Sequence, residues 1–221
     1  MGQTRETHVQ QLMAIGFTMV SVVLVACSLT GVLLAQDLEA KVTNFLERHK
    51  DEWVDMNVPE VDGKTLHDLI VQNQYKRALE IGTSTGHSGI WIAWALSKTG
   101  GKLITIEINE KRHQEALENF AEAGLSDYID ARLADAHALV PRLAGPFDFV
   151  FSDADKEWYT RYLQDVLPKL EMNGCFTAHN VSMGMSGIKD FLDYLETIPS
   201  LKTTIDRSSS SGLSISCKQL P

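Results

Sequence analysis

The chain has 221 residues and a formal net charge of −9, with 44% hydrophobic and 22% charged residues. This length is sufficient for one α/β domain with a full core. The acidic balance argues against a nucleic-acid partner, which would require a basic face. The three cysteines, Cys27, Cys175 and Cys217, show no metal-ligand spacing and do not indicate a disulfide framework. We expect Cys175 and Cys217 to be buried core thiols.

The N-terminal part of the chain differs from the rest, because Leu12 to Ala35 contains no acidic or basic residue. As a helix this segment would be about 36 Å long, enough to cross a bilayer. Three interpretations compete: a retained membrane anchor with the following domain in the cytosol, export with signal cleavage near Ala35, or a lipoprotein box at Leu24–Cys27. The apolar residues that follow Cys27 are unusual for a lipoprotein box. Basic residues are more frequent after the segment than before it, which favours the anchor. We therefore predict a hydrophobic anchor or signal segment at 1–36 and a separate domain at 37–221.

Strand and helix patterns alternate through the rest of the chain. In chain order we expect helices at 37–54 and 65–74, a strand at 77–81, a helix at 87–98, a strand at 102–107, a helix at 110–122, a strand at 129–133, a helix at 136–143, a strand at 147–152, a helix at 157–170, a strand at 175–178, a helix at 187–198, and strands at 202–205 and 212–217. Five alternations predict an α/β fold with a doubly wound, mostly parallel seven-stranded sheet that binds ligands at the carboxyl ends of its strands. The two last strands, with no helix between them, predict an antiparallel addition.

A glycine-containing turn follows the first of these strands, in the run Glu80-Ile-Gly82-Thr-Ser84-Thr-Gly86-His-Ser88. It lacks the second glycine of a dinucleotide fingerprint, because Ser84 stands there, and it lacks the lysine of a P-loop. Glu107 ends the next strand, where a carboxylate can accept hydrogen bonds from ribose hydroxyls. An ordinary strand-to-helix turn is the alternative, but Glu107 favours a nucleoside cofactor with no pyrophosphate. The amino-acid part of S-adenosylmethionine (SAM) would fit this turn.

Polar residues also follow the fourth and fifth strands of the predicted parallel sheet. Asp153 comes after the fourth strand, and His179 and Asn180 come at the end of the fifth. Because adjacent strand tips lie close together, these three side chains predict a divalent metal site with open positions. Lys156 would reach a substrate hydroxyl near that ion and act as general base. The alternative is structural: Asp153 and Asp155 would cap the following helix, Lys156 would be a surface lysine, and His179 and Asn180 would be turn residues.

From these motifs the chain resembles the SAM-dependent O-methyltransferases of the catechol and caffeoyl-CoA type, over about residues 54–218. The resemblance implies a class I Rossmann-like methyltransferase domain, with an entry loop at Met56-Asn-Val58 and Gly63 and an adenine-lining stretch at Ala134–His137. It implies Lys156 as the catalytic base and Asp153, His179 and Asn180 as metal ligands. The residues that it implies for cofactor binding are Val58, Glu80, Gly82, Ser84, Gly86, Ser88, Glu107, Ala136, His137 and Asp153.

The chain departs from this family at one ligand position. The family has Asp-Asn after the fifth strand, whereas this chain has His179-Asn180. The replacement removes one negative charge, so the site should bind magnesium less well. Manganese, iron or zinc would suit it better, or it binds no metal.

Three functional hypotheses follow. The first is methyl transfer from SAM to a hydroxyl of a small, catechol-like aromatic whose two oxygens chelate a metal ion while Lys156 removes a proton. The second keeps the cofactor but not the metal, with His179 as base. The third is a membrane-tethered module that binds the cofactor or a partner without catalysis. In the first hypothesis Trp158, Tyr159 and the loop 183–186 would form walls of the acceptor pocket. The sequence does not predict the acceptor itself or the oligomeric state.

Overall fold

The computed structural model describes residues 35–54 and 56–220. The chain divides into two compact units, residues 1–41 and 42–221. The described part of the first unit, residues 35–41, is helical, and the second unit begins with helical residues 42–48. The domain boundary predicted at residue 36 stays a prediction.

The expectation of a membrane-anchored protein needs correction. Among residues 35–54 and 56–220, no helix is long and apolar enough to cross a membrane. Two of the longer helices, α2 (Glu60–Asn73) and α4 (Glu110–Ala123), have 14 residues each, and so are about 21 Å long against a hydrocarbon core of about 30 Å. The segment on which the expectation rested, Leu12–Ala35, lies outside the described residues except for Ala35. The same is true of the expected N-terminal hydrophobic helix, and the alternative of export depends on the same segment.

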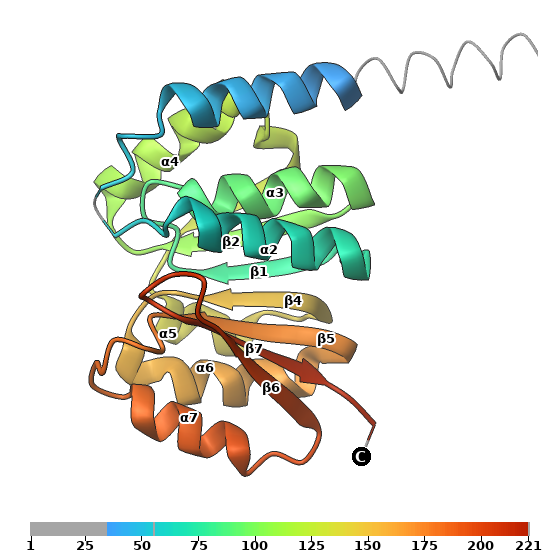
Figure 1. Cartoon of the computed structure of the whole chain (residues 1–221), viewed down its shortest axis with the longest axis vertical. Helices are drawn as coiled ribbons and strands as arrows, with labels where there is room; N and C mark the ends of the chain where they lie inside the picture. The colour runs from blue at the N-terminus through green and yellow to red at the C-terminus, as the bar shows by residue number, and fades with distance from the viewer. Residues whose placement is uncertain (1–34, 55, 221) are drawn as a thin grey trace, which may run out of the picture. The chain divides into compact units, whose positions relative to one another are not determined.

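A seven-stranded sheet forms the centre of the second unit, with the strand order β3-β2-β1-β4-β5-β7-β6 (Figure 1). Its strands are β1 (Arg77–Ile81), β2 (Lys102–Glu107), β3 (Ile129–Leu133), β4 (Phe147–Ser152), β5 (Leu170–His179), β6 (Leu201–Asp206) and β7 (Leu213–Lys218). The first five strands in this order pair in parallel. Only β7 runs against its neighbours, β5 and β6. The predicted doubly wound, mostly parallel sheet with an antiparallel addition is therefore confirmed.

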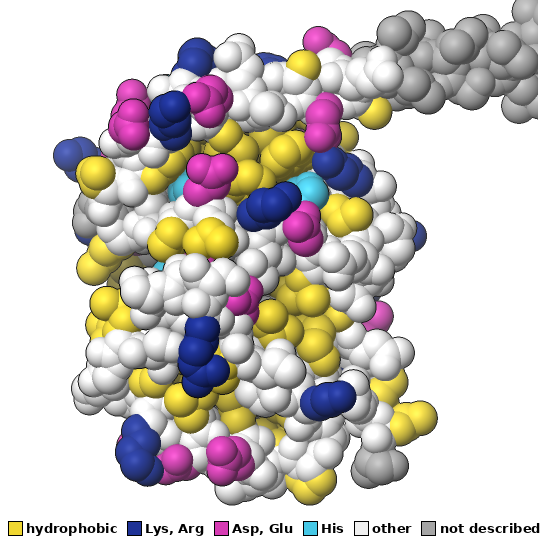
Figure 2. All heavy atoms as spheres, viewed as in Figure 1, with side chains coloured by type: hydrophobic (Ala, Val, Ile, Leu, Met, Phe, Trp, Pro, Cys, Tyr) yellow, Lys and Arg dark blue, Asp and Glu magenta, His cyan; other side chains and the backbone are white. Residues whose placement is uncertain are grey.

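Helices cover both faces of this sheet. Besides α2 and α4, they are α3 (His87–Thr99), α5 (Ala136–Leu139), α6 (Tyr159–Val166) and α7 (Ile188–Glu196). Alternate strand residues point to opposite faces, so Val150 packs with the hydrophobic residues of α6 and α7, whereas Phe149 and Phe151 pack with those of α2 and α3. Figure 1 shows α2 and α3 on one side of the sheet and α6 and α7 on the other. Lys, Arg, Asp and Glu side chains are interspersed on the face seen in Figure 2, so opposite charges partly cancel there.

Local sequence signals set most helix ends. Asn109 caps α4 by accepting a hydrogen bond from the Arg112 backbone, and Gly124 ends the helix in the left-handed conformation. Several boundaries differ from expectation: the helix expected at 37–54 ends at residue 48, and the one expected at 136–143 ends at Leu139. α2 begins at Glu60, directly after Pro59, rather than at Thr65. β5 begins at Leu170, so the helix expected to extend to that residue is shorter.

The expectation for two cysteines is wrong. Cys175 on β5 and Cys217 on β7 form a disulfide rather than two thiols. They are direct partners in the antiparallel register of these strands. The two cysteines are 42 residues apart in the sequence, so no local pattern predicts their pairing. Only the sheet register brings the two side chains together.

Candidate active site

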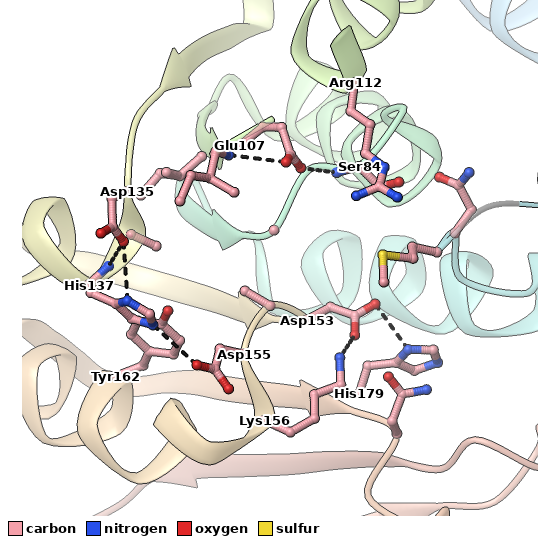
Figure 3. A pocket seen from close by; sticks show the side chains of 18 of the residues that line it. Ser84, Glu107, Arg112, Asp135, His137, Asp153, Asp155, Lys156, Tyr162 and His179 are labelled. Atoms are coloured by element: carbon pink, nitrogen blue, oxygen red, sulfur yellow. Dashed lines mark hydrogen bonds and ion pairs between the residues drawn. The ribbon is translucent and has the colours of Figure 1, made fainter. Parts of the chain in front are cut away.

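A cavity of about 530 Å³ opens at the carboxyl ends of β1, β2, β4 and β5, where a doubly wound sheet binds ligands. Its volume lies within the usual range for sites that hold drug-sized molecules. Figure 3 shows its polar side chains converging from several elements. The residues that line it are Met56, Asn57, Gly82, Ser84, Ile106, Glu107, Ile108, Arg112, Ala134, Asp135, Ala136, His137, Asp153, Ala154, Asp155, Lys156, Tyr162, His179, Asn180, Met183 and Met185.

The turn after β1 brings the backbone close to this cavity. Gly82 has φ +101, and a Cβ atom there would lie 2.8 Å from the carbonyl oxygen of Asp153. Only glycine combines this φ with such a close approach. Ser84 also has a positive φ, of 49°. A larger residue at position 82 would therefore clash with the backbone at Asp153.

Glu107 lies at the end of β2, 7% exposed, and is oriented by backbone groups. Its carboxylate accepts hydrogen bonds from the backbone N–H groups of Ser84 (2.8 Å), Ile108 (3.0 Å) and Asn109 (2.8 Å). A carboxylate has about four acceptor positions, so capacity remains for a ligand hydroxyl. The geometry thus fits the predicted ribose acceptor next to the Gly82 turn.

Glu80 lies in the core on β1, just before this turn, and does not line the cavity. It is fully buried and accepts a hydrogen bond from the Thr105 hydroxyl, while its Oε1 has no hydrogen-bond partner. Burial raises the pKa of Glu80 to about 7, although hydrogen bonds from Ser88 and Thr105 oppose the shift. The predicted cofactor residue Ser88 is therefore a partner of Glu80, and Gly86 is the N-cap of α3.

The stretch after β3 forms another wall. Asp135 caps α5 by accepting a hydrogen bond from the His137 backbone at 2.9 Å. The His137 ring lies between two carboxylates, 3.3 Å from Asp135 and 3.4 Å from Asp155. The ring also lies against two aromatic rings, Trp158 at a centroid distance of 3.9 Å and Tyr162 at 5.9 Å. Ala136 and His137 therefore line the cavity where the sequence placed the adenine, whereas Trp158 packs behind His137.

A chain of charged groups crosses the opposite wall. Lys156 Nζ donates to Asp153 Oδ1 at 2.6 Å, and His179 Nδ1 lies 3.1 Å from Asp153 Oδ2 (Figure 3). The second ring nitrogen of His179, Nε2, lies 2.8 Å from Asp62 Oδ2. Burial alone would lower the pKa of His179, but its hydrogen bonds to Asp153 and Asp62 outweigh burial and raise that pKa to about 9. At neutral pH the ring is thus an imidazolium.

The predicted metal ligands lie together, but they do not fit a metal ion in this arrangement. Both ring nitrogens of His179 contact carboxylates, and a protonated nitrogen has no lone pair to donate. Asn180 Nδ2 donates to the Met183 sulfur at 3.2 Å. Among the described residues, no group of three or more His, Cys, Asp or Glu side chains is arranged to hold a metal ion. The sequence thus predicted that Asp153, His179 and Asn180 lie together. In the described residues, however, these side chains are not arranged to bind a metal ion.

Some predicted residues lie outside the cavity, and some lining residues were not foreseen. Val58 is 3% exposed, and its carbonyl accepts a hydrogen bond from His87 Nδ1. Gly63 lies within α2, where a Cβ atom would clash with the Trp91 indole. Asp62 and the cavity residue Arg112 were missed, because acidic and basic residues in a first helical turn resemble ordinary surface positions.

The family model described as O-methyltransferase matches residues 34–187. A catechol O-methyltransferase from Niastella koreensis is 42% identical over 123 residues, which are 54% of this chain and 55% of that protein. Caffeoyl-CoA O-methyltransferase 1 from Eucalyptus globulus is 32% identical over 130 residues, 57% of this chain and 52% of that protein. The matched segments therefore span about half the length of these relatives.

Solved structures match over more of the chain. The O-methyltransferase from Bacillus cereus in complex with SAH superposes with a TM-score of 0.71 at 25% identity, covering 81% of this chain and 91% of that one. TomG from Streptomyces achromogenes in complex with SAM also gives a TM-score of 0.71, at 26% identity, covering 81% of this chain and 90% of that one. With the family match over most of its length and the Rossmann-like fold with its seven-stranded mixed sheet, this chain belongs to the O-methyltransferase family.

Proposed function

We propose that this chain transfers a methyl group from SAM to a hydroxyl of a small, catechol-like aromatic, and that residues 37–221 form the catalytic domain. One observation carries the proposal. The Gly82 turn and Glu107 line the same cavity as Lys156 and Asp153, so a nucleoside cofactor and a proton acceptor would meet in one space. Similarity to relatives named catechol and caffeoyl-CoA O-methyltransferases supports the acceptor class.

The residues present fit SAM. Glu107 would accept hydrogen bonds from the ribose hydroxyls, the Gly82 turn would lie against the amino-acid part, and Ala136 with His137 would border the adenine. The cavity of about 530 Å³ has room for the cofactor and part of an acceptor. When bound, SAM supplies an electrophilic methyl group and leaves as S-adenosylhomocysteine.

Lys156 is the proposed general base. Its side chain is 14% exposed and lines the cavity, and Asp153 fixes its direction through the 2.6 Å hydrogen bond. The Lys156 ammonium first gives up one proton to solvent. The neutral amine then takes the proton of the acceptor hydroxyl, and the oxygen forms a bond to the methyl carbon as the carbon–sulfur bond breaks. Positioning of the two reactants would supply much of the rate.

His179 is a poorer choice of base than Lys156. Both of its ring nitrogens already contact carboxylates, so neither is turned towards an acceptor in the cavity. Lys156 Nζ contacts one of these carboxylates, Asp153, and an amino group has further positions left for an acceptor hydroxyl. Because both ring nitrogens of His179 are occupied, the proposed reaction has no step through a metal ion.

Methionines form the proposed acceptor wall. Met56, Met183 and Met185 line the cavity and are 72%, 57% and 43% exposed. Unbranched thioether side chains adapt to apolar ligands and make favourable contacts with aromatic rings. This wall therefore favours a flat aromatic acceptor over a highly charged one.

The test is turnover of SAM with a panel of catechols and simple phenols, followed by mass spectrometry of the product. Replacement of the proposed base by Lys156→Met should lower kcat about 10²- to 10⁴-fold and leave the Kd for SAM unchanged. Lys111→Met, on the outside of α4, is the matched control. Full activity of Lys156→Met would refute the base. SAM binding without turnover of any acceptor would instead favour a non-catalytic module.

A further inference from the structure

Asp62 is a buried carboxylate that the sequence did not single out. It lies in the first turn of α2, is 2% exposed, and is not among the residues that line the cavity. Its Oδ2 lies 2.8 Å from His179 Nε2 and accepts a hydrogen bond from the Ser209 hydroxyl at 2.7 Å. Because an aspartate is almost never fully buried without a partner, the pairing with His179 explains its position.

Hydrogen-bond capacity determines which groups carry protons in this cluster. An ionised carboxylate can only accept, so His179 must donate from Nε2 to Asp62 and from Nδ1 to Asp153. Neither nitrogen then has a lone pair for a metal ion. Each oxygen of the Asp153 carboxylate accepts one hydrogen bond, Oδ2 from His179 and Oδ1 from Lys156. Every charged group of the cluster therefore has a partner within the protein.

The charges of this cluster also balance. Two carboxylates, Asp62 and Asp153, face an imidazolium and an ammonium, so the formal sum is zero. A divalent cation added to this group would leave two uncompensated positive charges in a largely buried site, which is costly. A carboxylate in place of His179 would instead leave an excess of negative charge, which is what a hard divalent cation requires.

We propose that the His179 ring, clamped between Asp62 and Asp153, occupies the place of a divalent cation, so that this site excludes metal. Asp62 is then a positioning residue. It fixes the ring of His179, the ring fixes Asp153, and Asp153 directs Lys156 into the cavity. The inference deepens the proposed function and rests on it only for the role of Lys156. The exclusion of metal requires neither the cofactor nor an acceptor.

The test is Mn²⁺ binding to the full chain, measured by electron paramagnetic resonance and by titration calorimetry. The wild type should show no binding below about 1 mM, whereas His179→Asp should bind Mn²⁺ at least roughly tenfold more tightly. His113→Asp, on α4, is the matched control and should behave as the wild type. Stoichiometric Mn²⁺ binding by the wild type would overturn the proposal, and so would a His179→Asp variant that folds, binds SAM and gains no metal.

A second measurement uses the wild type and does not depend on the folding of His179→Asp. Nitrogen-15 NMR at neutral pH should show both ring nitrogens of His179 protonated, and a lone-pair nitrogen in that ring would overturn the proposal.

The positioning role of Asp62 is tested with variants at that residue. The His179 Nε2–H proton resonance should shift in Asp62→Asn, with partial return in Asp62→Glu, and kcat should fall while KM changes little. An unchanged resonance in Asp62→Asn would refute the positioning role. Failure of the proposed methyl transfer would alter none of the metal or NMR results.

Discussion

The His179 cluster predicts a specific dependence of stability on pH. The pKa of His179 is about 9 in the folded protein and about 6.5 in an unfolded chain. Each pH unit between these values is worth about 1.4 kcal/mol, so the clamp contributes about 3 kcal/mol to the free energy of unfolding. Because the folded pKa is the higher one, this contribution is complete below pH 6.5 and is lost as the pH rises from 6.5 to 9.

The assay is urea unfolding of the wild type and of His179→Gln between pH 6 and pH 9.5. Glutamine cannot titrate, so the stability difference between the two proteins should shrink by about 3 kcal/mol across this range. His113→Gln, at a half-buried position of α4, controls for loss of a histidine elsewhere. A stability difference that stays constant from pH 6 to pH 9.5 would refute the imidazolium clamp.

Three further predictions concern the cofactor side of the cavity. Glu107→Gln should weaken SAM binding by about 1.5–3 kcal/mol through loss of a charged acceptor, and calorimetry showing an unchanged Kd would contradict the ribose role. Gly82→Ala should lower the melting temperature more than Gly100→Ala, because both have positive φ but only the Cβ at position 82 meets backbone, 2.8 Å away, whereas position 100 has open space. Burial raises the pKa of Glu80 from its ordinary value of 4.5 to about 7 in the folded protein, so its contribution to stability should fall by about 3 kcal/mol as the pH rises from 4.5 to 7. That fall should be missing in Glu80→Gln, and equal pH profiles of the two proteins would contradict it.

The sequence predicted the strands of the parallel sheet well because their signals are local. The runs 77–81, 102–107, 129–133 and 147–152 were placed correctly from hydrophobic patterning and the turn residues between them. The Gly82 turn, Glu107 and the convergence of Asp153, Lys156 and His179 also followed from the sequence. In a parallel sheet, residues that end neighbouring strands meet at one edge. This part of the site could therefore be predicted without the tertiary structure.

Other features depend on contacts between distant segments. α2 was expected to begin at Thr65, so Asp62 was placed in a loop and its burial could not be foreseen. Asp62 is 117 residues from His179 and 147 residues from Ser209, and no local pattern encodes such a pairing. The disulfide between Cys175 and Cys217 likewise requires the register of β5 and β7.

By itself, the sequence determined the family, the sheet and the identity of most groups at its carboxyl edge, because strand periodicity and turn chemistry are local properties. Only the tertiary structure decided which of those groups contact one another, and so which role each can have. A histidine at the end of β5 is equally compatible with a metal ligand, a base or a structural residue. Its role depends on what lies against each ring nitrogen, and packing of α2 on the sheet places the second carboxylate there.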